Sequence, residues 1–349
     1  MTLFAGAYRG ASVLVTGHTG FKGSWLVAWL NELGAKVTGY ALPPSTSPNH
    51  WQLLGADAGD EQGDIRDLEN LKAVVHACQP DIVFHLAAQP LVRRSYRDPL
   101  ETWSTNVMGT ANLLESCREL ANLAAIVVIT TDKVYANQEW PWGYRENERL
   151  GGHDPYSASK AATELLCDSY RNSFFHGQGS ALLATARAGN VIGGGDWSQD
   201  RLLPDIVRAV QQKQSLEIRS PNATRPWQHV VDCLSGYLLL GQRLLQGESA
   251  FAQAWNFGPD VADNRSVAAM LETLSRYWPE LNWHLSSGAH PHEAGLLYLD
   301  NSKAKSQLGW SPVWNLERAL AATAQWYSAQ ANGDISTRLQ LAAYVESAR

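Results

Sequence analysis

The sequence predicts an α/β protein with a Rossmann-type, doubly wound parallel sheet and a smaller C-terminal α/β domain. Its 349 residues are enough for roughly two domains. Short apolar runs alternate with helix-like segments up to about residue 190, and this alternation is typical of a parallel sheet covered by helices on both faces. The first apolar run leads into a glycine-rich turn, as in nucleotide-binding βαβ units.

The first βαβ unit is read directly from the sequence. Residues 12–16 (SVLVT) form a short strand, and the glycine turn 17–23 connects it to an amphipathic helix over 22–33. Gly34 is a residue type that commonly follows the last turn of a helix. A second strand is expected over 36–40 (KVTGY).

The following elements continue the alternation. We expect a polar, proline-rich loop over 41–50, a helix opened by GDIRD at 63–67, strands over 81–88, 124–131 and 181–191, and helices over 106–120 and 156–170. Beyond these, we expect a loop feeding a helix over 193–210, a polar loop over 219–232 and an apolar helix over 229–245 that packs back on the sheet. The last ~90 residues mix short strands and helices.

Composition limits the possible partners and the location. The formal net charge of −6 argues against nucleic acid, because binding to phosphates needs a net basic face. No apolar run approaches the roughly 20 residues of a membrane span, and the first residues lack a signal-peptide pattern. Four widely separated cysteines have neither zinc nor disulfide spacing. We therefore expect reduced thiols, a cytoplasmic location and no metal; HPHE at 290–293 resembles a metal cluster only superficially.

The turn GHTGFKG has glycines at 17, 20 and 23. Glycine permits a tight turn and a close backbone approach, and the helix that follows presents N–H groups to a pyrophosphate. A purely structural glycine turn is the alternative. The position of the turn, directly after the first strand, favours a dinucleotide site.

The end of the second strand does not identify the dinucleotide. An NAD site usually has an acidic residue there for the ribose hydroxyls, but residues 39–43 read GYALP. The first arginine afterwards is Arg66, too late to be an evident partner for an NADP 2′-phosphate, and Ser45 and Thr46 offer only weaker hydrogen bonds. The residues alone leave NAD and NADP open.

Tyr156 and Lys160 are four residues apart and share one face of the predicted helix. An ammonium group near a phenol favours the phenolate, so we expect Lys160 to lower the pKa of Tyr156 and make it a base nearer neutral pH. A surface Tyr and Lys would be the ordinary interpretation of this spacing alone. Thr131, which ends an earlier apolar strand 25 residues before Tyr156, together with the glycine turn favours a catalytic pair.

The motifs TGHTGFKG, HLAAQ, NVMGT, TTDKVY, YSASK and RAGNVIGGGDW resemble the extended short-chain dehydrogenase/reductase family over nearly the whole chain. GHTGFKGSWL, TTDKVY and GGGDWSQDRLLPD are most similar to its sugar-nucleotide 4,6-dehydratases, and among them to members that act on CDP-glucose. The resemblance implies tightly bound NAD, a homodimer through a helix bundle or a homotetramer, and CDP-glucose as the substrate. It also implies an NAD-binding part over 1–188, joined by about 228–260, and a nucleotide-sugar-binding part over 189–227 and 261–349.

The resemblance assigns site residues one by one. The implied triad is Thr131, Tyr156 and Lys160. The implied cofactor contacts are Gly17, Gly20, Phe21, Lys22 and Gly23 in the turn, Asp64 and Ile65 at the adenine, Leu86, Ala87 and Ala88 along the cofactor, and Tyr156 and Lys160. The implied substrate contacts are Gln89, Asn190, Arg201 and Arg225. Arginine offers a fork of donors that suits a diphosphate, although any one of these could be an ordinary solvated charge.

A dehydratase needs two proton-handling groups beyond Tyr156 and Lys160, since a proton leaves C5 and the C6 hydroxyl departs as water. Asp132 and Lys133 directly follow Thr131. In the dTDP-glucose relatives this pair is Asp-Glu, so Asp132 matches the acid and Lys133 departs from the pattern. We hypothesise that Lys133 removes the C5 proton; the alternative is that it only pairs with Asp132 or the substrate.

Two rival functions stay open at this point. A nucleotide-sugar 4-epimerase or reductase would use the same Tyr156 and Lys160, and a non-catalytic protein that senses NAD(H) would use the fold alone. For a dehydratase, the product would feed the synthesis of 3,6-dideoxyhexoses for the O-antigen of a bacterial surface polysaccharide. The choice of cytosine rests on the resemblance, and neither the final deoxysugar nor dimer against tetramer is decided.

Overall fold

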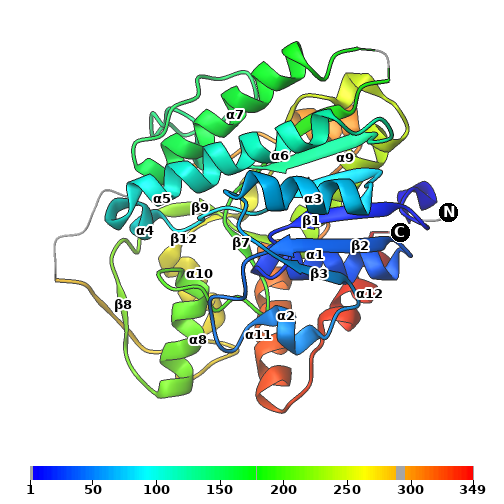
Figure 1. Cartoon of the computed structure of the whole chain (residues 1–349). Coiled ribbons are helices and arrows are strands. Elements are labelled where there is room, and N and C mark those ends of the chain that lie inside the picture. Colours follow the sequence, from blue (N-terminus) through cyan, green and yellow to red (C-terminus); the bar gives the residue numbers. More distant parts are fainter. Residues whose placement is uncertain (1–2, 178, 288–294, 349) are drawn as a thin grey trace.

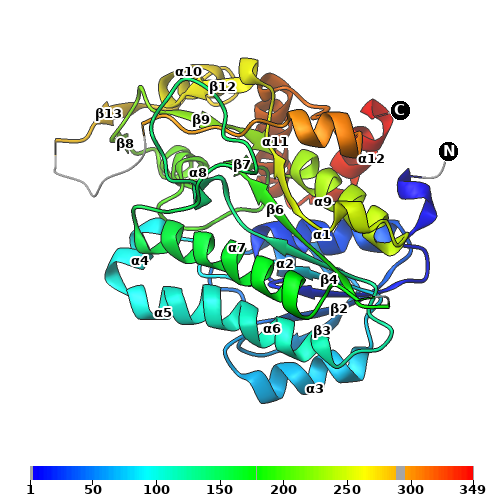
Figure 2. The same cartoon turned by 90° about the horizontal axis from the view of Figure 1, so that it is seen from above.

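The computed structural model describes residues 3–177, 179–287 and 295–348, and its centre is a seven-stranded parallel sheet between two layers of helices (Figures 1 and 2). The strand order is β11-β6-β5-β4-β1-β2-β3, and every pairing is parallel. The strands are β1 Ser12–Thr16, β2 Lys36–Ala41, β3 Gly59–Gln62, β4 Ile82–His85, β5 Ala125–Ile129, β6 Leu182–Ala188 and β11 Ala254–Phe257. The predicted Rossmann-type sheet is confirmed.

The order of the strands reverses at β1. From β1 the chain builds β2 and β3 toward one edge, then returns to place β4 on the other side of β1. Thr16, the last residue of β1, lies opposite Tyr40 of β2 and His85 of β4. In open parallel sheets, ligands bind at such a reversal, beyond the carboxyl ends of the strands.

Successive side chains of each strand point to opposite faces of the sheet and pack into two separate hydrophobic cores. Val13 and Val15 pack on one face and Leu14 on the other, and all three are buried. The first face is covered by α1 Phe21–Glu32 and α9 Val230–Leu245, with α11 Leu316–Ala331 and α12 Thr337–Ser347 outside them. The second face is covered by α3 Leu68–Cys78, α6 Gly109–Arg118 and α7 Pro155–Ser173. Because both faces of the sheet are buried, both sets of alternating side chains are apolar. The strands therefore appear in the sequence as nearly continuous apolar runs.

Several short elements differ from the sequence prediction. β3 was not predicted, because its sequence GDEQ is exposed and has no apolar residue, so only its pairing with β2 marks it as a strand. The GDIRD motif ends in Asp67, whose side chain caps α3 by accepting from the backbone N of Asn70, so the helix begins one residue later. The end of the predicted loop 41–50 belongs to α2 His50–Leu54.

The helix predicted over 106–120 is part of a longer helical stretch. α4 Val92–Arg97 and α5 Pro99–Trp103, which were not predicted, lead into a π-helical turn Ser104–Met108 and then α6. Pro99 at the start of α5 separates it from α4, as proline is tolerated in a first helical turn. Gly34 follows α1 in a left-handed conformation with φ of +79°, as expected from the sequence.

The remaining part of the chain lies beyond the carboxyl edge of the sheet. It contains α8 Leu202–Gln212, α10 Val267–Leu274 and the strand pairs β7 Val191–Ile192 with β10 Gln228–His229, β9 Thr224–Pro226 with β12 Asn264–Ser266, and β8 Leu216–Ile218 with β13 Trp283–Leu285. Short helical turns complete the structure at Leu3–Gly6, Asp132–Val134, Ser249–Phe251, Val261–Asp263 and Ala304–Leu308. The predicted polar loop 219–232 therefore holds two short strands and the first turn of α9.

The chain returns twice to the large sheet after leaving it. α9 packs on the face that carries Val13, and β11 pairs with β6 as the last strand. Within the described parts of the chain, no helix combines the length and the apolar character that a membrane crossing requires.

Candidate active site

A cavity of about 830 Å³ opens between the carboxyl edge of the sheet and the elements beyond it. Its lining comes from the first turn of α1, the segment after β5, the start of α7, the segment after β6, α8 and β8–β9. Among the residues predicted from the sequence, those on its wall are Lys22, Thr131, Asp132, Lys133, Tyr156, Asn190, Arg201 and Arg225. The fold thus brings to one place side chains that are about 200 residues apart in the sequence.

The glycine turn leaves no room for side chains. Gly17 has a φ of +77°, and a Cβ there would lie 2.6 Å from the backbone N of Ala87. A Cβ on Gly23 would lie 2.2 Å from the carbonyl oxygen of Gly17. The turn therefore packs directly on the segment after β4, and α1 begins at Phe21 with no described side chain capping its N-terminus. This is the close backbone approach with open N–H groups that a dinucleotide pyrophosphate requires.

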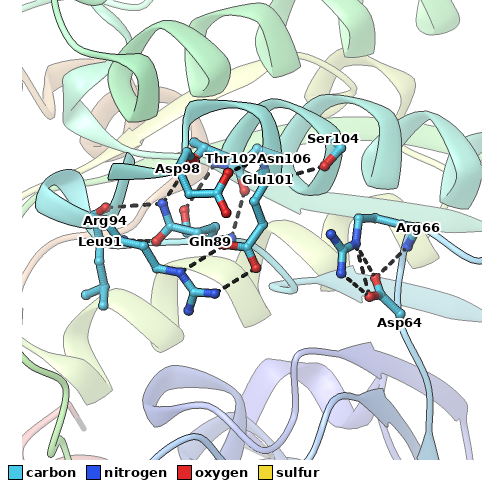
Figure 3. Close-up of polar contacts among 10 residues, drawn as sticks. All are labelled: Asp64, Arg66, Gln89, Leu91, Arg94, Asp98, Glu101, Thr102, Ser104 and Asn106. Carbon is cyan, nitrogen blue, oxygen red and sulfur yellow. Dashed lines mark hydrogen bonds and ion pairs between the residues drawn. The ribbon is translucent and has the colours of Figure 1, made fainter. Parts of the chain in front are cut away.

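An acidic group lies after β3 where none follows β2. The Asp64 carboxylate accepts from the backbone N of Arg66 at 2.9 Å and from its Nε at 3.0 Å (Figure 3). This pairing with Arg66 lowers the pKa of Asp64. Ile65 beside it is buried, and its carbonyl accepts from Asn112 at 3.2 Å. Arg66 is thus engaged with the carboxylate at the predicted adenine position.

Gln89 is held by other parts of the protein. Its amide donates to the Leu91 carbonyl at 3.1 Å and to Thr102 Oγ1 at 2.9 Å, and its side-chain oxygen accepts from the Leu91 N at 2.7 Å. Asn106 holds the backbone of Gln89, by accepting from its N at 2.8 Å and donating to its carbonyl at 3.2 Å (Figure 3). Gln89 was predicted to contact the substrate. In this structure it is buried, is not on the cavity wall, and its side chain holds the Leu91 backbone and Thr102 instead.

The residues after β5 form a tight turn at the cavity wall. Thr131 caps the short helical turn Asp132–Val134, and its hydroxyl donates to Asp132 Oδ1 at 2.9 Å. Asp132 is almost fully buried, and its Oδ2 has no hydrogen-bond partner within the described chain. The Lys133 amine lies 3.5 Å from Asp132 Oδ1, a long contact, and its side chain is about a quarter exposed (26%). A buried carboxyl group and an amine thus lie side by side at the cavity wall.

Tyr156 and Lys160 come from the first two turns of α7. The Lys160 amine donates to the carbonyl of Ile129 at 3.0 Å, which anchors the helix to the end of β5. Burial, assisted by the positive charge of Lys22, lowers the pKa of Lys160 to about 8. Lys160 itself lies behind the wall and does not line the cavity.

The pKa of Tyr156 shifts in the direction opposite to the sequence expectation. Burial raises it to about 12, and the hydrogen bond with Thr131 and the charge of Arg201 offset only part of that rise. The expected lowering by Lys160 is therefore wrong for this structure, because the loss of solvation outweighs the nearby cations. In this state Tyr156 carries its proton at neutral pH.

Three of the four predicted substrate residues line the cavity from elements after β6. Asn190 joins β6 to β7, where its carbonyl accepts from the backbone N of Gln228 at 3.1 Å. Arg201 precedes α8 and contacts Asp196 Oδ2 at 3.1 Å. Arg225 lies on β9 and donates to the Thr224 carbonyl at 2.8 Å. Two guanidinium groups and an amide thus line the cavity from separate elements.

Two further arginines, Arg93 and Arg219, lie on the wall and were not predicted from the sequence. Arg93 lies on α4 and pairs with Asp200 at 3.0 Å, across to the segment that precedes α8. The sequence offered a signal, since the basic run VRRSYR begins three residues after the HLAAQ motif at the end of a buried strand. Arg219 follows β8, at the start of the polar loop 219–232.

No cluster of three or more His, Cys, Asp or Glu suited to a metal ion is found among residues 3–177, 179–287 and 295–348. The HPHE segment at 290–293 lies outside the described residues. All four cysteines are free thiols, and three of them are buried.

The parallel sheet order, the glycine turn after β1 and the Tyr156–Lys160 pair beside Thr131 define the dehydrogenase/reductase class of Rossmann proteins. Within that class, the chain belongs to the GDP-mannose 4,6-dehydratase family, whose model matches residues 14–323.

Individual relatives agree with this membership. The chain is 50% identical over 337 residues to the CDP-glucose 4,6-dehydratase of Salmonella typhimurium, covering 94% of this chain and 93% of that protein. It is 28% identical to the dTDP-glucose 4,6-dehydratase of Streptomyces griseus, covering 90% and 93%. The higher identity to the CDP-glucose enzyme separates it clearly from the dTDP-glucose enzyme.

Solved structures support the fold. An epimerase from Methanothermobacter thermautotrophicus superposes with a TM-score of 0.82 at 24% identity, covering 95% of this chain and 96% of that one. A dTDP-glucose 4,6-dehydratase from Bacillus anthracis, solved in complex with NAD, superposes with a TM-score of 0.75 at 20% identity, covering 92% and 97%.

The glycine turn generates a direct prediction. Gly17→Ala forces a side chain into a left-handed backbone position and against the Ala87 backbone, so the turn must move away from β4. We expect titration of the purified variant with NAD, followed by protein fluorescence, to show binding weakened at least tenfold.

Gly247→Ala is the matched control. Gly247 has nearly the same φ, +76°, but a Cβ there meets nothing within 4 Å. The control should lose some stability and keep the wild-type affinity for NAD. Equal loss of affinity in both variants would contradict the proposed role of the close approach at Gly17.

Proposed function

We propose that the protein is a 4,6-dehydratase of CDP-glucose, which converts this substrate to CDP-4-keto-6-deoxyglucose with the loss of water. The observation that carries the proposal is the single cavity wall that presents Tyr156, Thr131, Asp132 and Lys133 together. An oxidation needs only the first two of these with Lys160, whereas a dehydration needs the added acid and base. The 50% identity to the Salmonella enzyme over nearly the full chain supports the same activity.

We infer that NAD is the cofactor, and it supplies one function when bound, which is to accept hydride from C4 of the glucose and return it to C6. The glycine turn at 17–23 and the open N-terminus of α1 fit its pyrophosphate. Asp64 offers an acidic group on the adenosine side, and its pairing with Arg66 leaves that arginine poorly placed for a 2′-phosphate. These contacts favour NAD over NADP. The Bacillus anthracis neighbour, solved as its NAD complex, supports the same choice.

In the first step, Tyr156 takes the proton of the C4 hydroxyl. Its phenol is hydrogen-bonded to Thr131 and lies near Arg201, whose charge lowers its pKa. A cation beside the phenol acts in the same direction, so the positively charged nicotinamide of bound NAD would lower the pKa of Tyr156 further and favour the phenolate that takes this proton. Lys160, anchored at Ile129, holds the helix that carries Tyr156.

The elimination uses the turn after β5. The 4-ketone acidifies the C5 proton; the C5–H bond breaks as Lys133 takes that proton, a C5=C6 double bond forms, and the C6–O bond breaks. Asp132 gives a proton to the departing hydroxyl, which leaves as water. Asp132 Oδ2 is buried at this wall without a partner in the described chain, and the Lys133 amine lies within 3.5 Å of Oδ1. In the final reduction at C6, Lys133 gives a proton back to C5, and Asp132 regains its proton from solvent before the next turnover.

We assign the diphosphate of the substrate to the part of the cavity that the elements after β6 contribute. Asn190, Arg201 and Arg225 line it, and guanidinium forks suit phosphate oxygens. The division of the chain into an NAD-binding part, 1–188 with about 228–260, and a nucleotide-sugar-binding part, 189–227 with 261–349, follows from these assignments. Cytosine as the base rests on the similarity to the Salmonella enzyme.

A homodimer, or a homotetramer built from it, is the assembly that the surface supports. Large apolar side chains are exposed along the neighbouring helices α5 to α7, among them Leu100, Trp103, Met108 and Leu165. An exposed apolar face of this kind is typical of a protein interface. Analytical ultracentrifugation that finds only monomers at micromolar concentration would contradict this assembly.

The buried thiols and the nucleotide substrate favour a cytoplasmic location. The product keeps its nucleotide and gains a ketone at C4, so it suits further enzymes that make 3,6-dideoxyhexoses for the O-antigen of a surface polysaccharide. Deletion of the gene in its host should then remove these sugars from the polysaccharide, and unchanged sugar composition would contradict this placement.

Two other functions use fewer of these residues. A 4-epimerase needs Tyr156 but has no use for Asp132 and Lys133 at C5 and C6. A protein that only senses NAD(H) has no use for an organised acid–base turn inside a cavity of this size.

Incubation with CDP-glucose, dTDP-glucose, UDP-glucose and GDP-mannose, each with and without added NAD, tests the proposal. We expect mass spectrometry to show the loss of one water from CDP-glucose and not from the other three. An unchanged mass for every sugar would support an epimerase or a sensor instead.

Lys133→Ala tests the base. In heavy water, the wild type should place deuterium at C5 of the product, and the variant should eliminate water at least ~100-fold more slowly, the usual contribution of a general base. Lys72→Ala, which removes an amine paired with Glu119 at 2.7 Å on the surface, is the control and should keep the wild-type rate. A normal elimination rate in Lys133→Ala would show that Lys133 is not the base.

A further inference from the structure

A buried ion pair lies behind the helical turn Asp132–Val134, which carries Asp132 and Lys133 and is named the catalytic turn. Glu164 of α7 and Arg187 of β6 meet at 2.9 Å, and their side chains are only 3% and 4% exposed. Neither residue is on the cavity wall. Burial alone would raise the pKa of Glu164, but the charge of Arg187 and its hydrogen bonds bring it below the usual value, so the pair is ionised. Because desolvation makes such pairs a poor source of stability, the contribution of this pair lies in what it holds in place.

The carboxylate of Glu164 fixes the residue before the catalytic turn. Its Oε1 accepts from Thr130 Oγ1 at 2.5 Å, and its Oε2 accepts from Thr185 Oγ1 at 2.7 Å. Thr130 directly precedes Thr131, and Glu164 lies one helical turn after Lys160. This carboxylate therefore ties the catalytic helix to the end of β5.

The guanidinium of Arg187 fixes the residue after the turn. Its Nη1 donates to the Tyr135 hydroxyl at 2.7 Å and to the Glu146 carbonyl at 3.0 Å. The Tyr135 hydroxyl donates in turn to Asn256 Oδ1 at 2.8 Å. The Tyr135 ring stacks on Tyr144 with centroids 5.0 Å apart. Tyr135 directly follows the turn Asp132–Val134.

The turn is thus clamped at both ends, by Thr130 and Tyr135, and the ion pair joins the two clamps. Within the turn, the link between Asp132 and Lys133 is only the 3.5 Å contact. Tyr156 and Thr131 are held at the other end of this turn, because Lys160 and Glu164 tie α7 to Ile129 and to Thr130. Loosening the Tyr135 end would therefore displace Asp132 and Lys133 and leave the groups for the oxidation in place.

We propose that Glu164, Arg187 and Tyr135 are positioning residues for the elimination step, acting by holding the turn that carries Asp132 and Lys133. The inference rests on the proposed dehydratase function. It separates two steps of one reaction by the contacts that hold their residues. Glu164 and Lys160 of α7 hold the groups for oxidation at C4, and Arg187 with Tyr135 holds the other end of the turn for loss of water.

Tyr135→Phe is the mildest test, since it removes one hydroxyl and keeps the stacked ring. The matched control is Tyr8→Phe, which removes an equally buried tyrosine hydroxyl bonded to the Leu238 carbonyl at 2.6 Å, at the N-terminal end of the chain. Each enzyme is mixed with CDP-glucose and NAD, quenched on the millisecond scale and analysed by mass. The 4-keto intermediate has lost two hydrogens, and the product has lost water.

In Tyr135→Phe we expect the 4-keto intermediate to form at the wild-type rate and to accumulate, with elimination slowed about 100-fold, as for a misplacement near 1 Å. Tyr8→Phe should pass through the intermediate as the wild type does. Glu164→Gln, which keeps the shape and removes the charge, should shift the same ratio of intermediate to product. If Tyr135→Phe is poorly folded, this second variant carries the test.

Equal slowing of both steps, or an unchanged ratio of intermediate to product in both Tyr135→Phe and Glu164→Gln, would overturn the positioning role. A wild type that makes no dehydrated product would instead overturn the proposed function. The two failures are therefore distinguishable in one data set.

Discussion

The parallel pairing of β1 with both β2 and β4 is the constraint on which the site depends. It brings the carboxyl ends of the central strands to one edge and places the reversal of strand order at Thr16. The turn at Gly17 can then pack on the backbone of Ala87, and α1 can start with free N–H groups. The turn after β5 and the segment after β6 reach the same edge, so a cavity forms there.

Burial sets the acid–base state of this cavity. It raises the pKa of Tyr156 to about 12 and lowers that of Lys160 to about 8, so each group is pushed toward its neutral form. Asp132 is buried with one oxygen unsatisfied in the described chain, beside an amine that is partly open to solvent. Because these groups are shielded from solvent, their positions depend on contacts with the surrounding protein. The buried Glu164–Arg187 pair provides such contacts at both ends of the turn that carries Asp132 and Lys133.

Much of the fold could be predicted from the sequence, because its central strands are apolar and its βαβ spacing is regular. The exposed strand β3 could not, since GDEQ has no pattern of its own and exists by pairing with β2. At the site, motifs identified Thr131, Asp132, Lys133 and Tyr156 on the cavity wall, but not the electrostatics of these groups. The shift of Tyr156 depends on burial and on Arg201, and the engagement of Gln89 on Leu91 and Thr102 depends on packing. The basic run VRRSYR could have marked Arg93 as a candidate site residue. Its pairing with Asp200 could be seen only in the three-dimensional structure.

The central claim is that one cavity oxidises C4, removes water and reduces C6 without releasing the sugar. The most direct measurement uses CDP-glucose that carries deuterium at C4, mixed in equal amounts with CDP-glucose that carries no deuterium but has carbon-13 throughout the glucose. The account predicts deuterium at C6 of the product only in molecules without carbon-13. Deuterium at C6 of the carbon-13 molecules, or its loss to solvent, would contradict it.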